Sequence, residues 1–125
     1  MAHVLVVEDD PSLLEVVCKY LEKSGFSVEG APHGRNALER TLRRAPDVMI
    51  VDLLMPHMDG CHLLEILRSY FRLRELPVIV LTGLSDSPMI NRVRNMKVKT
   101  VLQKGKVTMD QIVEAVKVEL EGASN

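Results

Sequence analysis

Acidic, hydroxyl and lysine side chains stand where short apolar runs of this sequence end. In chain order they are Glu8-Asp9-Asp10, Asp52, Thr82 and Lys104. Carboxylates packed together repel one another unless a cation lies between them, and hard oxygen ligands together with a phosphate suit Mg²⁺. A lysine attracts an incoming anion, and a threonine hydroxyl can hydrogen-bond to a phosphoryl oxygen. These groups together indicate phosphoryl transfer to a carboxylate, in which catalysis is mainly positioning and charge neutralisation.

The elements that must position these side chains follow from hydrophobic periodicity. Apolar, β-branched runs predict strands at residues 3–7, 26–29, 47–51, 77–81 and 100–103. Runs without polar alternation are typical of parallel strands covered on both faces. Helical periodicity predicts a first helix with Asp10 as cap and Gly25 after its end, a last helix from Met109 to Leu120 with Thr108 as cap, and helices near 34–44, 61–72 and 87–96.

Five strands alternating with five helices predict an α/β sandwich with parallel strands and right-handed crossovers. In such sheets, functional groups gather beyond the carboxyl ends of the strands. Taken singly, an acidic run after a strand is often a solvated helix start, and a lone Asp, Thr or Lys there is usually structural. Their combination at four strand ends favours a shared site.

Length and composition bound the class of protein. The 125 residues suit one domain with a real core, and contents of 46% hydrophobic and 26% charged residues are ordinary for a soluble globular protein. A net charge of −1 favours neither nucleic acid nor an anionic membrane, and 3% aromatic residues offer little for base stacking. Apolar runs of four residues are too short to span a membrane, and no signal peptide is recognisable. We therefore expect a cytoplasmic protein whose cysteines, Cys18 and Cys61, are reduced thiols.

Two segments resemble the receiver domains of two-component response regulators. Residues 6–12, Val-Val-Glu-Asp-Asp-Pro-Ser, look like the family's first strand and acidic pair, and residues 52–60, Asp-Leu-Leu-Met-Pro-His-Met-Asp-Gly, are similar to its phosphorylation-site segment. Thr82 and Lys104 follow Asp52 at the spacing of the family's hydroxyl and lysine. The resemblance covers essentially residues 1–125 as a single receiver domain. It implies a flavodoxin-like, doubly wound (βα)5 sandwich with a five-stranded parallel sheet in the order 2-1-3-4-5.

The resemblance also implies roles for the acidic residues. Asp52 would accept a phosphoryl group from the phosphohistidine of a sensor histidine kinase or phosphotransfer protein. Asp9 and Asp52 would ligate Mg²⁺ directly, with the backbone carbonyl of Leu54 as a further ligand and Glu8 acting through a bound water. Asp10 lies outside the family's acidic pair and is better interpreted as a helix cap.

The remaining site residues would act on the phosphoryl group. Thr82 and Lys104 would contact its oxygens, and the small Gly83 would let it approach the backbone. The implied function is a phosphorylation-dependent signalling switch that changes affinity for an output domain or partner. Such a protein is not an enzyme acting on external substrates, since it catalyses only its own phosphoryl transfer and slow self-dephosphorylation.

The sequence departs from the family pattern at several positions. Val101 stands where the family usually has a switch Tyr or Phe, and Gly105 stands where it usually has Pro after the lysine. These changes keep open an alternative, a phosphate-independent adaptor on the receiver fold. The two positions that tune dephosphorylation are Leu54 and Leu84, which predicts a shielded phosphoryl group and slow self-hydrolysis.

Other candidate sites have plainer interpretations. A phosphatase of the haloacid dehalogenase type would need a second acid where this chain has Leu54. His57 lies within residues 52–60 and His62 shortly after them, without zinc-type spacing, which favours surface or loop histidines. A basic stretch could form salt bridges in a homodimer through the fourth helix, fifth strand and fifth helix, or could be a solvated helix face; it contains Arg92, Arg94, Lys97 and Lys99.

Several properties stay open at the sequence level. Residues 121–125 suggest a frayed tail or the start of a linker. The output domain or partner, the cognate kinase and the oligomeric state are not encoded in any motif.

Overall fold

Five parallel strands form one sheet in the order β2-β1-β3-β4-β5, as the sequence and its family resemblance predict. The computed structural model describes residues 1–124. Its strands are β1 (His3–Val7), β2 (Ser27–Ala31), β3 (Val48–Val51), β4 (Val78–Thr82) and β5 (Thr100–Gln103). All four neighbouring pairs are parallel, so the carboxyl ends of the strands share one edge of the sheet.

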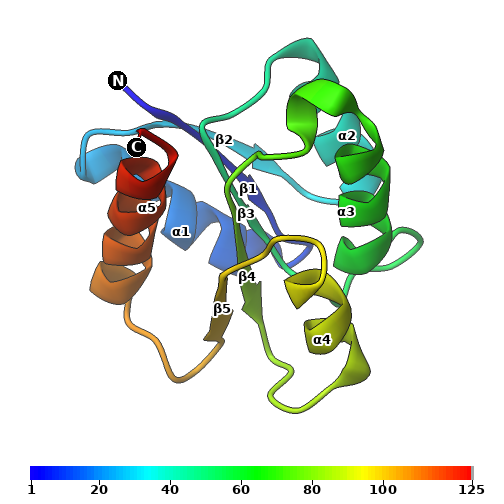
Figure 1. Ribbon diagram of the computed structural model, residues 1–125. Helices are drawn as coiled ribbons and strands as arrows, with labels where there is room; N and C mark the ends of the chain where they lie inside the picture. The colour runs from blue at the N-terminus through cyan, green and yellow to red at the C-terminus, as the bar shows by residue number, and fades with distance from the viewer. Residues whose placement is uncertain (125) are drawn as a thin grey trace.

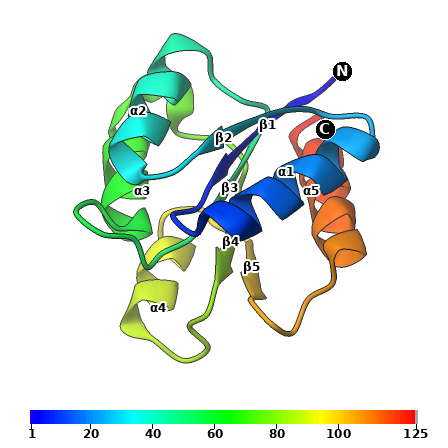
Figure 2. The ribbon, with the colours of Figure 1, turned by 180° about the vertical axis from the view of Figure 1, so that it is seen from behind.

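Helices cover both faces of the sheet (Figures 1 and 2). They are α1 (Pro11–Lys23), α2 (Gly34–Arg43), α3 (Gly60–Ser69), α4 (Pro88–Arg94) and α5 (Met109–Ser124), with a short 3₁₀ helix, η1 (Phe71–Leu73). Helices α1 and α5 pack on one face, and α2, α3 and α4 pack on the other. The fold is therefore the doubly wound α/β sandwich expected from the sequence. Within residues 1–124, none of the helices combines the length and apolarity that crossing a membrane requires.

The sheet has two cores because successive side chains of a strand point to opposite faces. In β1, Leu5 and Val7 pack in the core beneath α2, α3 and α4, whereas Val4 and Val6 pack in the core beneath α1 and α5. All four side chains are at most 1% exposed. This double burial explains why the strands appear in the sequence as continuous apolar runs.

Side-chain caps begin the first and last helices where the sequence predicts them. The Asp10 carboxylate accepts hydrogen bonds from the amides of Ser12 and Leu13, and Pro11 occupies the first turn. The amide of Gln111 donates to Thr108 Oγ1, and the Gln111 side chain accepts from the Thr108 amide. This reciprocal pair is a capping box.

Several predicted boundaries were wrong by a few residues. The third helix ends at Ser69, not at residue 72, because Tyr70 has extended backbone angles (φ −85°, ψ 126°) and η1 follows. Strand β2 is displaced toward Ala31, and α4 is shorter than its predicted range. Residues 121–124, suggested as a tail or linker, continue α5; Asn125 lies outside the described residues.

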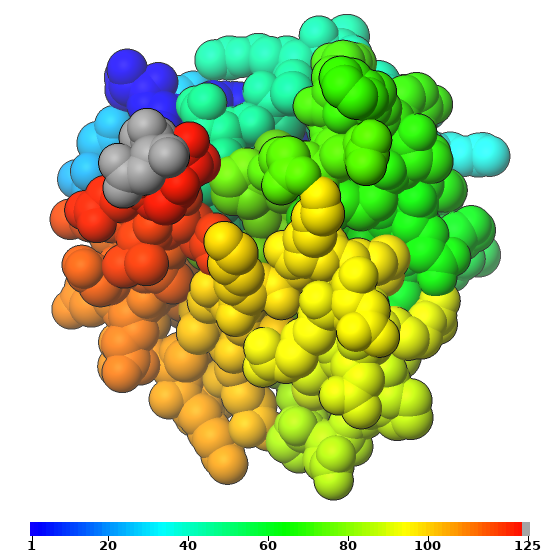
Figure 3. Space-filling view, viewed as in Figure 1, coloured from blue at the N-terminus to red at the C-terminus, as the bar shows by residue number. Residues whose placement is uncertain are grey.

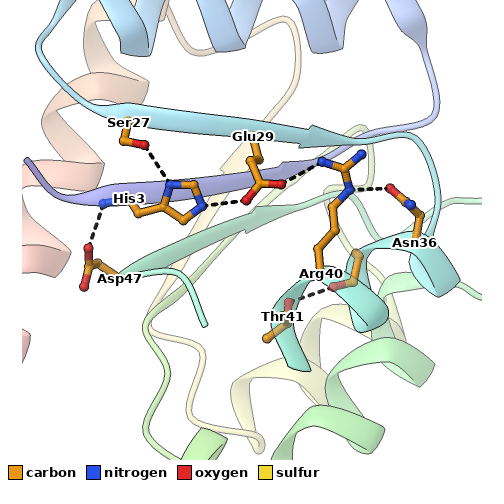
Figure 4. A network of polar contacts seen from close by, with 8 residues as sticks. His3, Ser27, Glu29, Asn36, Arg40, Thr41 and Asp47 are labelled. Carbon is orange, nitrogen blue, oxygen red and sulfur yellow. Dashed lines mark hydrogen bonds and ion pairs between the residues drawn. The ribbon is translucent and has the colours of Figure 1, made fainter. Parts of the chain in front are cut away.

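A polar network at the amino-end edge of the sheet joins β1, β2 and α2 (Figure 4). The buried His3 ring lies 3.0 Å from both Ser27 Oγ and Glu29 Oε1. The other oxygen of Glu29 accepts from Arg40 at 2.8 Å, and the His3 amide donates to Asp47 at 2.7 Å. This network closes the end of the sheet opposite the acidic strand ends. The sequence analysis assigned no role to it.

Candidate functional site

The backbone brings the ends of β1 and β3 together. The Asp52 amide donates to the carbonyl of Val7 at 3.1 Å, and the Glu8 amide donates to the carbonyl of Ala31 at 3.0 Å. These bonds extend the parallel pairing beyond both strands and set Glu8 and Asp52 at the same edge. The edge is therefore built by strand register rather than by flexible loops.

Three carboxylates converge at this edge. Each of Glu8, Asp9 and Asp52 offers an oxygen within 4.8 Å of the others. Glu8 and Asp52 are only 3% and 4% exposed, whereas Asp9 is exposed. Oxygen donors in this number, open to solvent on one side, fit Mg²⁺, which keeps several waters in its coordination shell. Among residues 1–124, no other three His, Cys, Asp or Glu side chains meet in this way.

Lys104 reaches both buried acids from the end of β5. Its Nζ lies 2.7 Å from Asp52 Oδ2 and 2.7 Å from Glu8 Oε1. The sequence analysis expected Lys104 to face the phosphoryl oxygens; its bond to Glu8 was not foreseen. One ammonium group thus offsets part of the charge of two carboxylates, which is the role of a cation in such a cluster.

Burial and the lysine act on the protonation of the site in opposite directions. Burial raises the pKa of Glu8, and the hydrogen bond from Lys104 offsets only part of that rise. Burial alone would lower the pKa of Lys104, but its hydrogen bonds with Asp52 and Glu8 raise it above the ordinary value. Lys104 is therefore held in its charged form, and it provides a fixed positive charge for an anion.

The Thr82 hydroxyl and the loops after β3 and β4 complete the acidic edge of the sheet. Thr82 is fully buried, and its Oγ1 accepts from the Leu84 amide at 3.3 Å. Its carbonyl accepts from the Lys104 amide at 2.8 Å, so the hydroxyl and the ammonium groups belong to adjoining chain segments. The Leu54 amide donates to Asp52 Oδ1 at 3.2 Å, while the Leu54 side chain is 51% exposed.

Gly60 lets residues 52–60 pack closely against the end of β3, a role that no sequence pattern predicted. A Cβ at this position would lie 2.5 Å from the Asp52 carbonyl oxygen and 2.8 Å from the Leu53 Cα. The preceding Asp59 caps α3 by accepting from the His62 amide at 2.8 Å. The Asp59-Gly60 pair therefore begins α3 with a side-chain cap and a close backbone approach to β3 that a Cβ would obstruct. The Asp-Gly pair is visible in the motif of residues 52–60, but hydrophobic periodicity gives no indication of this close packing.

Val101 in β5 and Gly105 just after it, the two departures from the family pattern near Lys104, have clear structural consequences. Val101 is half-buried and packs against the core beneath α2, α3 and α4, so an aliphatic side chain occupies the position of the family's aromatic residue. Gly105 has φ +82°, in the left-handed region. Proline, whose ring restricts φ to about −65°, does not adopt this conformation. The backbone conformation after Lys104 therefore suits glycine and excludes proline.

The histidines and cysteines stay outside the acidic cluster. His57 and His62 are exposed and, with His33 and Asp9, line a hollow of about 640 Å³ beside the site. The Nδ1 atom of His33 accepts from the Asn36 amide and caps α2. Both cysteines, Cys18 and Cys61, are free, as predicted.

Comparisons with known proteins agree with this geometry. Residues 4–117 match the response regulator receiver domain family. The chain is 32% identical over 86 residues to the DNA-binding dual master transcriptional regulator RpaA of Synechocystis sp., covering 69% of this chain and 36% of that protein. It is 39% identical over 81 residues to the response regulator MprA of Mycolicibacterium vanbaalenii, covering 65% of this chain and 34% of that protein. The chain therefore spans about a third of the length of these two relatives.

A solved receiver structure covers almost the whole chain. The signal receiver domain of a signal transduction histidine kinase from Syntrophus aciditrophicus superposes with a TM-score of 0.87 at 34% identity, covering 98% of this chain and 92% of that one. The parallel sheet in the order β2-β1-β3-β4-β5, with helices on both faces, defines an α/β domain of the receiver class. The chain belongs to the response regulator receiver domain family of two-component systems.

Proposed function

We propose that this chain is a phosphorylation-dependent signalling switch in which Asp52 accepts a phosphoryl group from a sensor histidine kinase or a phosphotransfer protein. The observation that carries the proposal is the placement of Asp52. Asp52 follows directly after β3 and lies near two further acids. Its side chain is 5% exposed and lies 2.7 Å from the Lys104 ammonium. A buried acid held beside both a lysine and a candidate cation site is arranged for attack on a phosphoryl group.

The reaction follows from the groups present. A carboxylate oxygen of Asp52 attacks phosphorus, the P–N bond to the donor imidazole breaks, and the imidazole leaves with that electron pair and takes up a proton from water. The product is an acyl phosphate on Asp52. Lys104 and the Thr82 hydroxyl stabilise the phosphoryl oxygens, since both belong to the same edge.

The acidic cluster is the proposed Mg²⁺ site. Asp9 and Asp52 would be the direct ligands, with the Leu54 carbonyl as a third ligand and Glu8 acting through water. Bound Mg²⁺ would neutralise charge on the attacking carboxylate and the phosphoryl oxygens. The exposure of Asp9 leaves this side of the cluster open to ions and to a phosphodonor.

Intact-mass analysis after incubation with acetyl phosphate tests the proposal. We expect a phosphoryl adduct that requires Mg²⁺ and is absent from Asp52→Asn. The matched control is Asp110→Asn, which removes an exposed acid from the first turn of α5. An adduct that persists in Asp52→Asn would refute the assignment of the acceptor.

A phosphate-independent adaptor is the second candidate function. It is favoured by Val101, which fills the position of the switch aromatic with a half-buried aliphatic side chain. Absence of an adduct in the experiment above, together with no binding of beryllofluoride, would favour the adaptor. A change in partner affinity after phosphorylation would exclude it.

We also propose a homodimer through α4, β5 and α5, with fewer basic residues available for contacts between protomers than the sequence suggested. Arg92 is ion-paired with Glu65, and Lys97 with Glu75, within the same chain. Of the basic stretch, these pairs leave Arg94 and Lys99 for contacts between protomers. Sedimentation of the beryllofluoride-treated protein tests the dimer, and a concentration-independent monomer would contradict it.

A further inference from the structure

The charges of this chain are unevenly distributed between two regions. Residues 34–99 contain eleven of the 16 lysines and arginines but only seven of the 17 aspartates and glutamates. These residues include α2, α3 and α4 with their connections. A net charge of −1 for the whole chain therefore conceals a positive region next to a negative one.

Part of the positive charge gathers at the amino-end edge of the sheet, opposite Asp52. The connection after α2 and the segment around η1 lie side by side there (Figure 3), and Arg72 Nη2 donates to the carbonyl of Leu42 at 2.8 Å. We call this surface the basic edge. It consists of Arg43, Arg44, Phe71, Arg72 and Arg74, all of which are exposed.

The arginines of the basic edge differ from other surface cations of the protein. Lys19, Arg40, Arg92 and Lys97 each form an ion pair with a glutamate. Within residues 1–124, none of the four arginines of the basic edge forms one, although all are exposed. Charge collected in this way without partners is costly through self-repulsion and favours an anion from outside.

Two acids close to the basic edge, Glu75 and Glu29, are paired with other cations. Glu75 is ion-paired with Lys97, which lowers its pKa, and Arg74 adds only a weaker attraction. Glu29 is shared between Arg40 and His3 (Figure 4). Glu39, one helical turn before Arg43, forms no ion pair among the described residues. The positive charge of the basic edge is therefore not neutralised from within.

An apolar feature lies among these charges. Phe71 is 85% exposed, and the Arg74 guanidinium lies 5.7 Å from the centre of its ring. On the side of α2 and β2, Arg40, Arg43, Arg44 and Glu29 line a hollow of about 260 Å³. An exposed aromatic ring next to arginines has the composition of a protein-recognition surface, where Arg and aromatic residues are enriched.

We infer that the basic edge is a docking surface for an acidic protein segment that carries an apolar side chain. Carboxylates of the partner would pair with Arg43, Arg44 and Arg74, because the guanidinium fork matches carboxylate geometry. The apolar side chain would cover Phe71. A single strongly exposed ring gives one apolar anchor, whereas binding of single-stranded nucleic acid uses successive stacking rings along a charged groove.

This surface lies at the opposite end of the sheet from Asp52, so a segment docked there would leave the acidic edge uncovered. The inference goes beyond the proposed switch, and its test does not require a phosphorylated protein. A receiver with such a surface could stay attached to its partner in both signalling states.

The test measures fluorescence anisotropy of a fluorescein-labelled peptide of glutamate and leucine added to the full chain. We expect binding that weakens with ionic strength and is lost when glutamine replaces glutamate in the peptide. The variant Arg43→Gln/Arg44→Gln should bind at least about tenfold more weakly, as loss of interfacial charge pairs does. The control Lys23→Gln/Lys106→Gln makes the same charge change at exposed positions elsewhere and should stay within about twofold.

A second pair of variants isolates the apolar anchor. Phe71→Ser should weaken binding about fivefold or more, since truncation of an aromatic anchor costs at least about 1 kcal/mol. Val118→Ser, which changes a 55% exposed side chain on α5, should not. Circular dichroism confirms that every variant is folded.

Three outcomes would overturn the inference. The first is equal weakening in both charge-change variants, which would show attraction to overall charge alone. The second is absence of peptide binding to the unmodified chain. The third is tighter binding to phosphatidylserine vesicles or to a single-stranded oligonucleotide than to the peptide, which would assign the basic edge to another class of partner.

Discussion

Replacement of Lys104 by methionine tests whether one ammonium group stabilises two buried carboxylates. In the native protein, Nζ lies 2.7 Å from both Glu8 and Asp52, whose side chains are 4% and 5% exposed. Methionine keeps most of the length of the side chain and removes its charge. The two acids then remain buried in each other's field without a cation.

The expected loss of stability follows from the burial of the three groups. Removal of one partner of a buried ion pair typically costs about 3–5 kcal/mol. The Lys104 side chain is 26% exposed, so solvent screens part of its interaction. Glu8 can also take up a proton, which relieves part of the repulsion. We therefore expect Lys104→Met to lower the free energy of unfolding by about 2–3 kcal/mol near neutral pH.

The pH dependence of this loss has a definite sign. Burial already raises the pKa of Glu8 above 4.5, and without Lys104 it rises further. An acid with a raised pKa in the folded state binds more protons there, so it stabilises at low pH and this stability is lost as pH rises through the raised value. The difference between the native protein and Lys104→Met should therefore shrink as the pH falls and Glu8 of the variant becomes protonated.

Urea denaturation at neutral pH and over a series of mildly acidic pH values measures the effect, with Lys106→Met as the control. Lys106 is exposed, and its substitution should change stability by less than about 0.5 kcal/mol. A loss for Lys104→Met no larger than the control, or one that grows at low pH, would refute this account of the site.

Three further predictions concern the loops and the helix that surround the site. Gly60→Ala should cost about 1–3 kcal/mol in urea denaturation, because its Cβ would lie 2.5 Å from a backbone carbonyl oxygen, whereas Gly83→Ala, with open space around it, should be nearly neutral; equal costs would contradict the packing argument. Leu54→Asn combined with Leu84→Glu should speed decay of the phosphorylated protein about tenfold or more by placing polar groups near the acyl phosphate, and an unchanged decay rate would reject the shielding role of these leucines. Asp10→Ala should lower the free energy of unfolding by about 1 kcal/mol through loss of two capping hydrogen bonds to α1, and no change would show that the cap is replaced by water.

Val101 stands where receiver domains usually have an aromatic switch residue. In this structure Val101 is half-buried against the core beneath α4, while the Thr82 hydroxyl is fully buried at the site. An aliphatic side chain has no ring to turn between exposed and buried orientations.

Local rules determined much of the fold. The caps at Asp10 and Thr108 and the apolar runs of the strands are visible in the sequence, and the structure confirms them. These features depend on neighbours within one helical turn or one strand. Where a boundary depends on packing, as at Tyr70 between α3 and η1, the sequence prediction extended the helix too far.

The sequence by itself determined which chemical groups stand at the strand ends, because strand termination and residue type are local properties. Only the tertiary structure decided how those groups pair. Lys104 lies 52 residues after Asp52, and its hydrogen bonds to Asp52 and Glu8 exist because strand order and register bring three chain segments to one edge. The basic edge arises in the same way, where Arg72 reaches the carbonyl end of α2 across 30 residues of sequence. Side-chain contacts over such separations depend on the geometry of the whole sheet, which no local pattern contains.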